Sequence, residues 1–284
     1  MRQLAKHVLK LVITLLLGGL LAATLVRFAP GFGMDEAQLD IRLNNQSIDA
    51  LKRQSKEGLG AFYVHYCERL LRGDFGMSRT LERPVAELIR ERMPETLKSV
   101  ALGLLLGWTL GLSLACLTAM ARSAALDSIA GIFCGTLLCI PAAVLAILFV
   151  IAQAPERLVL AAVAFPQIYR YARNLLIRSM NQPHVLTGWA KGLGNLRLLF
   201  WHVLRPAAPQ LLAVAGVSAS LAFTAAIPVE ALCDLPGVGQ LAWKAAMGRD
   251  LYLLVTLTVL VTAVTLIANS TCELLGNMLG TRHA

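Results

Sequence analysis

The side chains that could perform chemistry are few in this 284-residue chain, and their spacing does not favour catalysis. Of the five histidines, only His184 and His202 lie near each other, and their separation fits no zinc-binding pattern. Ser218 or Ser220 would need a neighbouring general base to act as a nucleophile, and no histidine falls in an apolar segment. The phosphate-binding pattern G-x-x-x-x-G-K-[ST] does not occur in the sequence. The sequence therefore predicts no catalytic residue and no metal site.

The most distinctive polar segment is Thr187–Pro209, TGWAKGLGNLRLLFWHVLRPAAP. Its apolar residues follow the spacing of one helical face, Leu193, Leu196, Leu199, Phe200 and Val203. The basic residues Lys191, Arg197 and Arg205 lie off that stripe. Three glycines are expected to interrupt the helix start and to permit a tight turn, Gly188, Gly192 and Gly194. A short helix after such a turn could insert into a groove of a partner protein or lie on anionic lipid; these residues alone leave both interpretations open.

Hydropathy sets the elements that carry these residues. The chain is 57% hydrophobic and only 15% charged, which is more apolar than an ordinary soluble domain. Charges are almost absent from Leu11–Val26, Ser99–Ala121, Ser128–Gln153, Leu158–Ile168, Ala207–Val229 and Leu251–Ser270. Most of these segments reach the roughly 20 residues that a helix needs to cross a bilayer, the first of them as Val8–Ala29. The sequence predicts an all-α polytopic membrane helix bundle with about six transmembrane helices.

The placement of charge predicts which loops are cytoplasmic. A net charge of +9 is compatible with nucleic-acid binding, but the basic residues are concentrated in one loop. No Asp or Glu occurs between Arg157 and Val229, where the basic residues are Arg170, Arg173, Arg178, Lys191, Arg197 and Arg205. The N-terminus is also basic, with Arg2, Lys6 and Lys10. Short loops rich in Lys and Arg stay in the cytoplasm, so the N-terminus and the 170–205 loop are both predicted inside, and no nucleic-acid partner is predicted.

The same charge rule also predicts whether the weakest apolar segment crosses the membrane. Leu158–Ile168 is too short to span alone, but two cytoplasmic loops must be separated by an even number of spans. Leu158–Ile168 is therefore predicted to span, with Tyr169–Ala172 extending the helix. The N-terminus also fits a cleaved signal peptide; Arg27 and Pro30, where a small-residue cleavage site would be expected, favour a retained membrane helix.

Gly31–Lys98 is predicted to form the largest segment outside the membrane. Within it, Ile48–Leu71 has a helical pattern, and Pro84 opens an amphipathic run that is expected to end before Pro94.

The sequence also gives structural predictions for Pro141, Cys67 and Cys233. Pro141 is expected to kink the third span or simply to be tolerated there. Cys67 and Cys233 are predicted on the extracytoplasmic side, either as a pair or as free thiols.

The segment HVLTGWAKGLGNLRLLFWHVLRPAAP resembles the cytoplasmic coupling motif of ATP-binding-cassette (ABC) importer permeases, in their dipeptide, oligopeptide and nickel branch. In that branch the motif reads roughly Y-V-R-T-A-R-A-K-G, followed after a spacer by H-x-L-R and a proline. Leu186 and Trp189 replace basic residues of the motif, and Pro206 stands at a usual Asn position. The resemblance implies a coupling helix at about 184–206, with ATPase contacts by Thr187, Gly188, Ala190, Lys191, Gly192, His202, Leu204 and Arg205.

Two other segments resemble the same branch. GDFGMSRTLERPVAELIRERMPETL is similar to its first external segment, and VEALCDLPGVGQLAWKAAMGRD to the segment after its fifth span. Pro-Gly followed by Gly reads as a turn that re-enters or caps the translocation pathway, with an ordinary external hairpin as the alternative. The residues that the resemblance places at this extracytoplasmic gate or turn are Glu230, Pro236, Gly237, Gly239, Arg249 and Asp250.

The resemblance implies a permease subunit of an ATP-driven importer for a peptide or related small solute, in the inner membrane. Residues 1–98 would form an N-terminal transmembrane helix and extracytoplasmic segment, and residues 99–284 the permease core. The implied partners are a second permease subunit, two ABC ATPase subunits that hold ATP and Mg²⁺, an extracytoplasmic solute-binding protein and membrane lipid. The chain itself would bind no cofactor and catalyse no reaction. A short third external loop, between Pro141 and Arg170, leaves a non-transporting membrane scaffold or signalling partner as the alternative.

Overall fold

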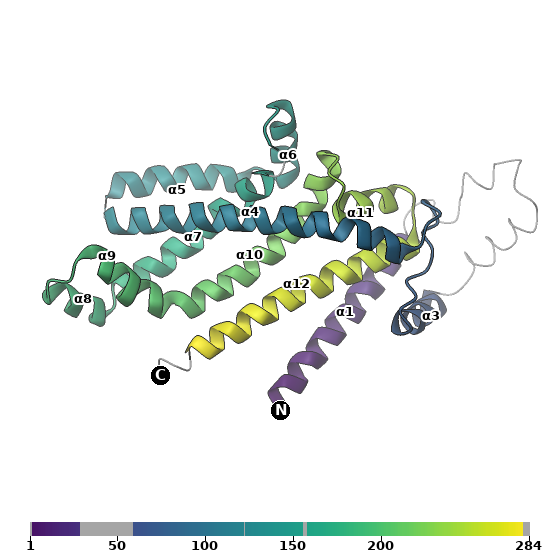
Figure 1. The fold of residues 1–284 in the computed structure, drawn as a ribbon, viewed down its shortest axis with the longest axis horizontal. Helices are drawn as coiled ribbons and strands as arrows, with labels where there is room; N and C mark the ends of the chain where they lie inside the picture. Colours follow the sequence, from purple (N-terminus) through teal and green to yellow (C-terminus); the bar gives the residue numbers. More distant parts are fainter. Residues whose placement is uncertain (1, 29–58, 122, 156–157, 281–284) are drawn as a thin grey trace, which may run out of the picture. The chain divides into compact units, whose positions relative to one another are not determined.

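The computed structural model describes residues 2–28, 59–121, 123–155 and 158–280 (Figure 1). Every regular element in these ranges is a helix, which confirms the predicted all-α class. Backbone contacts divide the chain into two compact units. The N-terminal unit is Met1–Met93 with Leu241–Ala263, and the core unit is Pro94–Gln240 with Val264–Ala284. The division at 98/99 between an external segment and a permease core stays a prediction.

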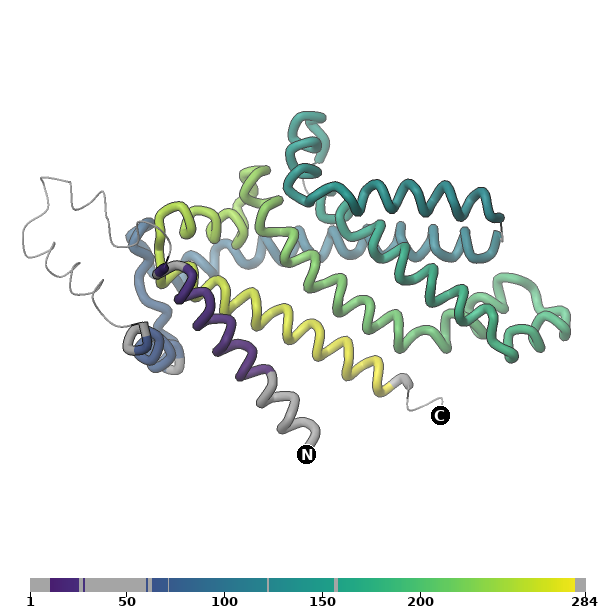
Figure 2. The backbone as a smooth tube through the Cα atoms, turned by 180° about the vertical axis from the view of Figure 1, so that it is seen from behind, coloured from purple at the N-terminus to yellow at the C-terminus, as the bar shows by residue number. Residues whose placement is uncertain are grey.

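The helices follow the predicted apolar segments closely (Figure 2). In chain order they are α1 (Arg2–Phe28), α3 (Leu59–Leu71), α4 (Val85–Ala121), α5 (Ala124–Cys139), α6 (Ala142–Ile151), α7 (Val159–Met180), α8 (Pro183–Ala190), α9 (Asn195–Leu198), the π-helix η3 (Leu199–Leu204), α10 (Arg205–Leu232), α11 (Val238–Met247) and α12 (Leu251–Gly280). The segment Leu158–Ile168 is helical, and α7 continues through Tyr169–Ala172 as expected. Of the helical pattern at Ile48–Leu71, residues 48–58 lie outside the described ranges.

Three helical segments of the described chain are long and apolar enough to cross a membrane, Val85–Ala121, Asn195–Leu232 and Leu251–Met278. The helices α5 and α6 together would make a fourth, although they are bent by 96° at their junction. Helix α1 contributes a shorter apolar stretch, Leu11–Leu25. A membrane fold with several apolar helices is therefore confirmed, while the number of six spans stays a prediction.

Prolines act differently at two of the expected breaks. The chain bends sharply at Pro141, which precedes the first residue of α6, so the kink predicted for the third span is a complete break. The expected helix end before Pro94 is wrong, because α4 runs through Pro94 without interruption. A proline removes only one backbone hydrogen bond from a helix, and long membrane helices accommodate that loss.

Small residues allow α4 and α7 to approach closely within the core unit. Three glycines recur at every fourth position of α4, Gly103, Gly107 and Gly111. A Cβ atom at Gly103 would lie 2.6 Å from the Leu160 Cβ, and one at Gly107 would lie 3.1 Å from the Ala164 Cβ. Such glycine spacing is typical of tightly packed membrane helices. The close approach helps to hold α7 in the bundle although this helix carries three arginines.

Replacing Gly107 with Leu should therefore destabilise the core unit. Inserting a large side chain into a packed interface costs about 1–3 kcal/mol. Gly131→Leu on α5 is the matched control, because a Cβ at Gly131 meets no atom within 4 Å. Unfolding of the detergent-solubilised chain, followed by circular dichroism during a denaturant titration, measures both variants. Equal stability of the two variants would contradict the packing argument.

Serines of α10 serve helix packing. The Trp108 indole N–H donates a hydrogen bond to the Ser218 Oγ at 3.0 Å, and the Asn269 side-chain amide donates to the Ser220 Oγ at 2.6 Å. These bonds link α10 to α4 and to the last part of α12. Interhelical bonds of this kind stabilise membrane bundles, so both serines have a structural partner.

The N-terminal unit is built around aromatic side chains of α3. The Tyr63 hydroxyl donates to the Leu16 carbonyl of α1 at 2.5 Å, and the Tyr66 hydroxyl donates to the Thr256 Oγ1 of α12 at 3.2 Å. Burial raises the pKa of Tyr63 to about 12, so its phenol remains a hydrogen-bond donor at neutral pH. Cys67, on the same helix, is a free thiol, as is Cys233 in the core unit.

Candidate functional site

The segment that follows α7 begins with the short helix α8, which ends in a glycine turn. Gly192 has φ +73°, a conformation that L-residues with a Cβ rarely adopt. Its N–H donates to the Trp189 carbonyl at 2.9 Å, and the Leu193 N–H donates to the Gly188 carbonyl at 3.2 Å. These two bonds define a Schellman motif, which satisfies the last carbonyls of α8. The turn predicted from the three glycines is therefore present, and Gly192 is the glycine that it requires.

The turn contradicts one detail of the prediction. Gly188 was expected to interrupt the helix start, but it lies buried inside α8. A Cβ at this position would lie 3.3 Å from the Leu198 Cδ1. A glycine here permits a close approach between α8 and the following helix, and that tertiary contact outweighs its low helix propensity.

The helix after the turn does not present a single apolar face. Leu199 and Val203 are buried, whereas Leu196 and Phe200 are 65% and 60% exposed. Residues Leu199–Leu204 form the π-helix η3, in which each turn contains more residues than in an α-helix. The predicted stripe is therefore split into a buried row and an exposed row.

The exposed row and the exposed apolar side chains of α8 are together called the docking surface here. Its apolar members are Leu186, Trp189, Leu196, Phe200 and Trp201, exposed by between 43% and 65%. Lys191 and Arg197 are exposed beside them. The Arg205 guanidinium lies over the Trp201 ring, 5.4 Å from its centroid, which is a cation–π contact. An apolar patch with a basic rim is the composition expected of a protein-binding site.

The remaining predicted coupling residues hold the segment together. The Thr187 hydroxyl donates to the Pro183 carbonyl at 3.0 Å, and the His202 carbonyl lies 2.9 Å from the His184 Nε2. Ala190 is the last residue of α8, and Leu204 is the last residue of η3. The structure brings all eight predicted coupling residues into one region of the core unit. His202 and Leu204 are partly buried there, whereas Thr187 is exposed.

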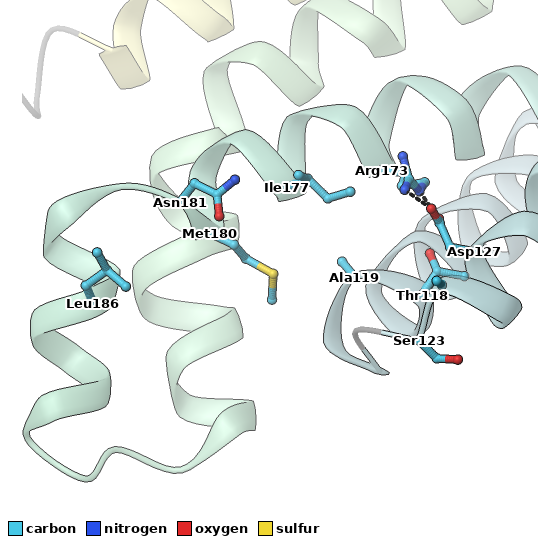
Figure 3. A pocket seen from close by; sticks show the side chains of 10 residues that line it. Thr118, Ala119, Ser123, Asp127, Arg173, Ile177, Met180, Asn181 and Leu186 are labelled. Atoms are coloured by element: carbon cyan, nitrogen blue, oxygen red, sulfur yellow. Dashed lines mark hydrogen bonds and ion pairs between the residues drawn. The ribbon is translucent and has the colours of Figure 1, made fainter.

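A cavity of about 470 Å³ lies beside the docking surface (Figure 3). Leu186 of α8 lines one side of this cavity. Asp127 of α5 and Arg173 of α7 line the opposite side, where their side chains point toward each other. Arg173 binds both carboxylate oxygens of Asp127, and both side chains are partly exposed. This ion pair connects the first turn of α5 to α7, the helix that leads into α8. Arg173 belongs to the basic residues predicted to be cytoplasmic, and its pairing with Asp127 was not predicted.

Four residues of the predicted gate or turn gather around Glu230 in the core unit. The Glu230 carboxyl, 1% exposed, accepts hydrogen bonds from the Thr96 hydroxyl at 3.1 Å and from the Gly239 N–H at 2.7 Å. The Thr96 hydroxyl in turn accepts from the Val238 N–H at 2.7 Å. A Cβ at Gly237 would overlap the carboxyl group, so only glycine leaves it room. This cluster, named the Glu230 clasp, ties the end of α10 and the Pro-Gly-x-Gly turn to α4; Pro236 lies exposed in that turn.

The other two predicted residues lie in the N-terminal unit. Asp250 is 1% exposed, and its Oδ2 accepts from the Ser78 hydroxyl at 2.7 Å and from the Arg79 N–H at 2.6 Å. Its Oδ1 accepts from the Leu253 N–H at 3.1 Å, which caps the start of α12. Arg249 precedes it with φ 51° and is exposed. The six predicted residues thus fall into two groups, four in the core unit and two in the N-terminal unit.

Thr96 and Ser78 are the residues that the site prediction missed. Both are buried hydroxyl side chains that bind a carboxylate more than 130 positions away in sequence. Their only signal in the sequence was their place in the segment that resembles the first external segment of the permease branch. The described ranges contain no group of three or more His, Cys, Asp or Glu side chains that could hold a metal ion.

Comparison with known proteins supports one family. The model of the family described as "binding-protein-dependent transport system inner membrane component" matches residues 103–282. The oligopeptide transport system permease protein OppB of Salmonella typhimurium is 29% identical over 222 residues, covering 71% of this chain and 72% of that protein. OppB of Haemophilus influenzae is 28% identical over 276 residues, covering 88% and 89%. A putative peptide permease protein of Brucella suis is 25% identical over 295 residues, covering 91% and 92%.

Proposed function

Since this chain belongs to the family of binding-protein-dependent transport system inner membrane components, we propose that it carries peptides across the inner membrane. The chain is a multi-pass permease subunit of an ABC importer rather than an enzyme. The matched region contains the docking surface, the cavity beside it and the Glu230 carboxyl. A peptide substrate is supported by the relatives in Salmonella, Haemophilus and Brucella, whose names refer to oligopeptides or peptides.

The single observation that carries the coupling mechanism is the docking surface. It combines exposed aromatic and aliphatic side chains with Lys191 and Arg197, and it lies on a segment that has no acidic residue. Such a surface is costly to leave in water. We infer that each permease subunit offers it to one ABC ATPase, and that two ATPases holding ATP and Mg²⁺ drive a pair of permease subunits.

The proposed orientation follows from charge. The basic stretch from Arg170 to Arg205 and the basic N-terminus would lie in the cytoplasm, and the Glu230 and Asp250 clusters on the extracytoplasmic side. An extracytoplasmic solute-binding protein would deliver the peptide there. Closure of the ATPases would then favour the outward-open bundle only through contacts that differ between the two states.

The test is uptake by the reconstituted complex of both permeases, both ATPases and the binding protein. ATP-dependent accumulation of a labelled oligopeptide is the expected result, with ATP hydrolysis stimulated when the loaded binding protein is added. A complex that assembles but shows neither uptake nor stimulation would support the non-transporting scaffold instead. Accumulation of Ni²⁺ without peptide would keep the permease role and overturn the peptide assignment.

A further inference from the structure

A groove runs between α7 and α10 in the core unit, on residues that the coupling mechanism does not use. It consists of two cavities, of about 330 Å³ and about 370 Å³, which share Leu175, Arg178 and Gln210 in their linings. Because these three residues line both cavities, the two cavities adjoin each other. The groove extends along α7 from Tyr171 to beyond Arg178, which is roughly 10 Å at the helical rise.

The two ends of the groove differ in chemistry. One cavity is bordered by Ser179, Gln182 and His184, all of which carry hydrogen-bonding groups. The other is bordered by the Tyr171 ring and by Ala213 and Val214. Arg178 lies where the two cavities meet. A groove with a cation near its middle, polar groups on one side of it and apolar walls on the other fits an amphiphilic molecule with an anionic head.

The charges around Arg178 also favour an anionic ligand in the groove. Arg178 is exposed, and no carboxylate of the described chain lies within ion-pair distance of its guanidinium, in contrast to Arg173, which binds Asp127. No acidic residue occurs in sequence between Arg157 and Val229. No carboxylate on α7 or on the neighbouring part of α10 therefore competes with a bound anion for Arg178. Arginine binds phosphate strongly because its fork matches two phosphate oxygens.

We propose that this groove binds an anionic glycerophospholipid, with the phosphate at Arg178 and an acyl chain along Tyr171, Ala213 and Val214. Basic pockets between membrane helices at the cytoplasmic face are suited to anionic head groups. The proposal rests on the proposed orientation, which puts Arg178 at the cytoplasmic interface. The lipid would stabilise α7 against α10 next to the segment that carries the docking surface.

The test is native mass spectrometry of the purified, delipidated transporter complex, titrated with dioleoyl phosphatidylglycerol or dioleoyl phosphatidylcholine. We expect retention of phosphatidylglycerol over phosphatidylcholine. Arg178→Gln should weaken phosphatidylglycerol binding about fivefold, the effect of one basic side chain at a membrane surface. Arg170→Gln removes the same charge from an exposed position of α7 that lines neither cavity, and it should leave the preference intact. Ala213→Trp fills the apolar end at an exposed position and should reduce retention of both lipids.

Four results would overturn the proposal. The first is equal retention of the two lipids by the unmodified complex, and the second is equal weakening by Arg178→Gln and Arg170→Gln. The third is binding of inorganic phosphate that is as tight as that of the lipid and unaffected by Ala213→Trp, which would make free phosphate the ligand. Cross-linking of a cysteine at Ala213 to the second permease, with no lipid retained, would likewise show that a protein helix covers the groove. Since lipid retention needs no transport, a complex that keeps the lipid but does not take up peptide would overturn only the proposed function.

Discussion

Adding one methyl group at Gly237 is expected to destabilise the chain by about 3 kcal/mol, because it would displace the buried Glu230 carboxyl from its donors. The Cβ of Gly237→Ala would occupy the space of that carboxyl group. The carboxyl would then lose the Thr96 hydroxyl and the Gly239 N–H while it remained buried. Leaving a buried polar group without hydrogen-bond partners costs about 1–3 kcal/mol of stability, and more if the group is charged.

A double-mutant cycle separates this cause from general strain in the turn. Glu230→Ala removes the obstructing carboxyl, so Gly237→Ala in that background should cost less than about 1 kcal/mol further. Gly131→Ala is the neutral control, since a Cβ there has open space. The free energy of unfolding of the detergent-solubilised variants, from denaturant titration, gives all four corners of the cycle. Additive effects of the two substitutions would show that Glu230 and Gly237 do not act as a unit.

The second large effect is expected on coupling rather than on stability. Gly192→Val should reduce ATP-dependent peptide uptake at least tenfold while basal ATP hydrolysis by the complex persists. A Cβ at Gly192 would meet no atom within 4 Å, so the substitution acts through its φ of +73° and not through a clash. The left-handed conformation costs a residue with a Cβ about 1–2 kcal/mol, and relief of that strain would open the Schellman turn and misplace the docking surface.

Two further variants make this prediction specific. Gly194→Val is the matched control, because Gly194 also has open space around its Cα but an ordinary φ of −64°; it should transport normally. Gly192→Asn should restore much of the uptake, since Asn tolerates the left-handed region better than other residues. Uptake and ATP hydrolysis are measured on the same reconstituted vesicles. Normal uptake by Gly192→Val, or an equal defect in Gly194→Val, would remove the turn from the coupling mechanism.

Hydropathy and charge were sufficient to predict most of the helices. Each apolar segment became a helix or a helix pair, because a bilayer leaves few other ways to satisfy backbone hydrogen bonds. The short segment at Leu158–Ile168 was predicted from the parity of cytoplasmic loops and is helical. The predictions failed where tertiary contacts overrode local preference, as at Pro94 within α4 and at Gly188 within α8.

The candidate site could be predicted as a set of residues but not as a geometry. Resemblance supplied Glu230 and Asp250, yet their partners Thr96 and Ser78 bind them from distant parts of the chain. Residue spacing along the sequence does not indicate which distant residues will pair in the fold. The glycines at Gly103, Gly107 and Gly111 did carry a readable signal, since small residues at every fourth position indicate close helix packing.

Because of the π-helix η3, the direction in which the docking surface faces depends on the number of residues between α9 and α10. An extra residue in one helical turn shifts everything before it by about 100° relative to everything after it. Phe200 and Trp201 are exposed within this π-helix, so their direction relative to α10 includes this shift. Deleting Leu204 alone would leave every residue of the docking surface in the chain, and it would still rotate these residues relative to α10 by about 100°.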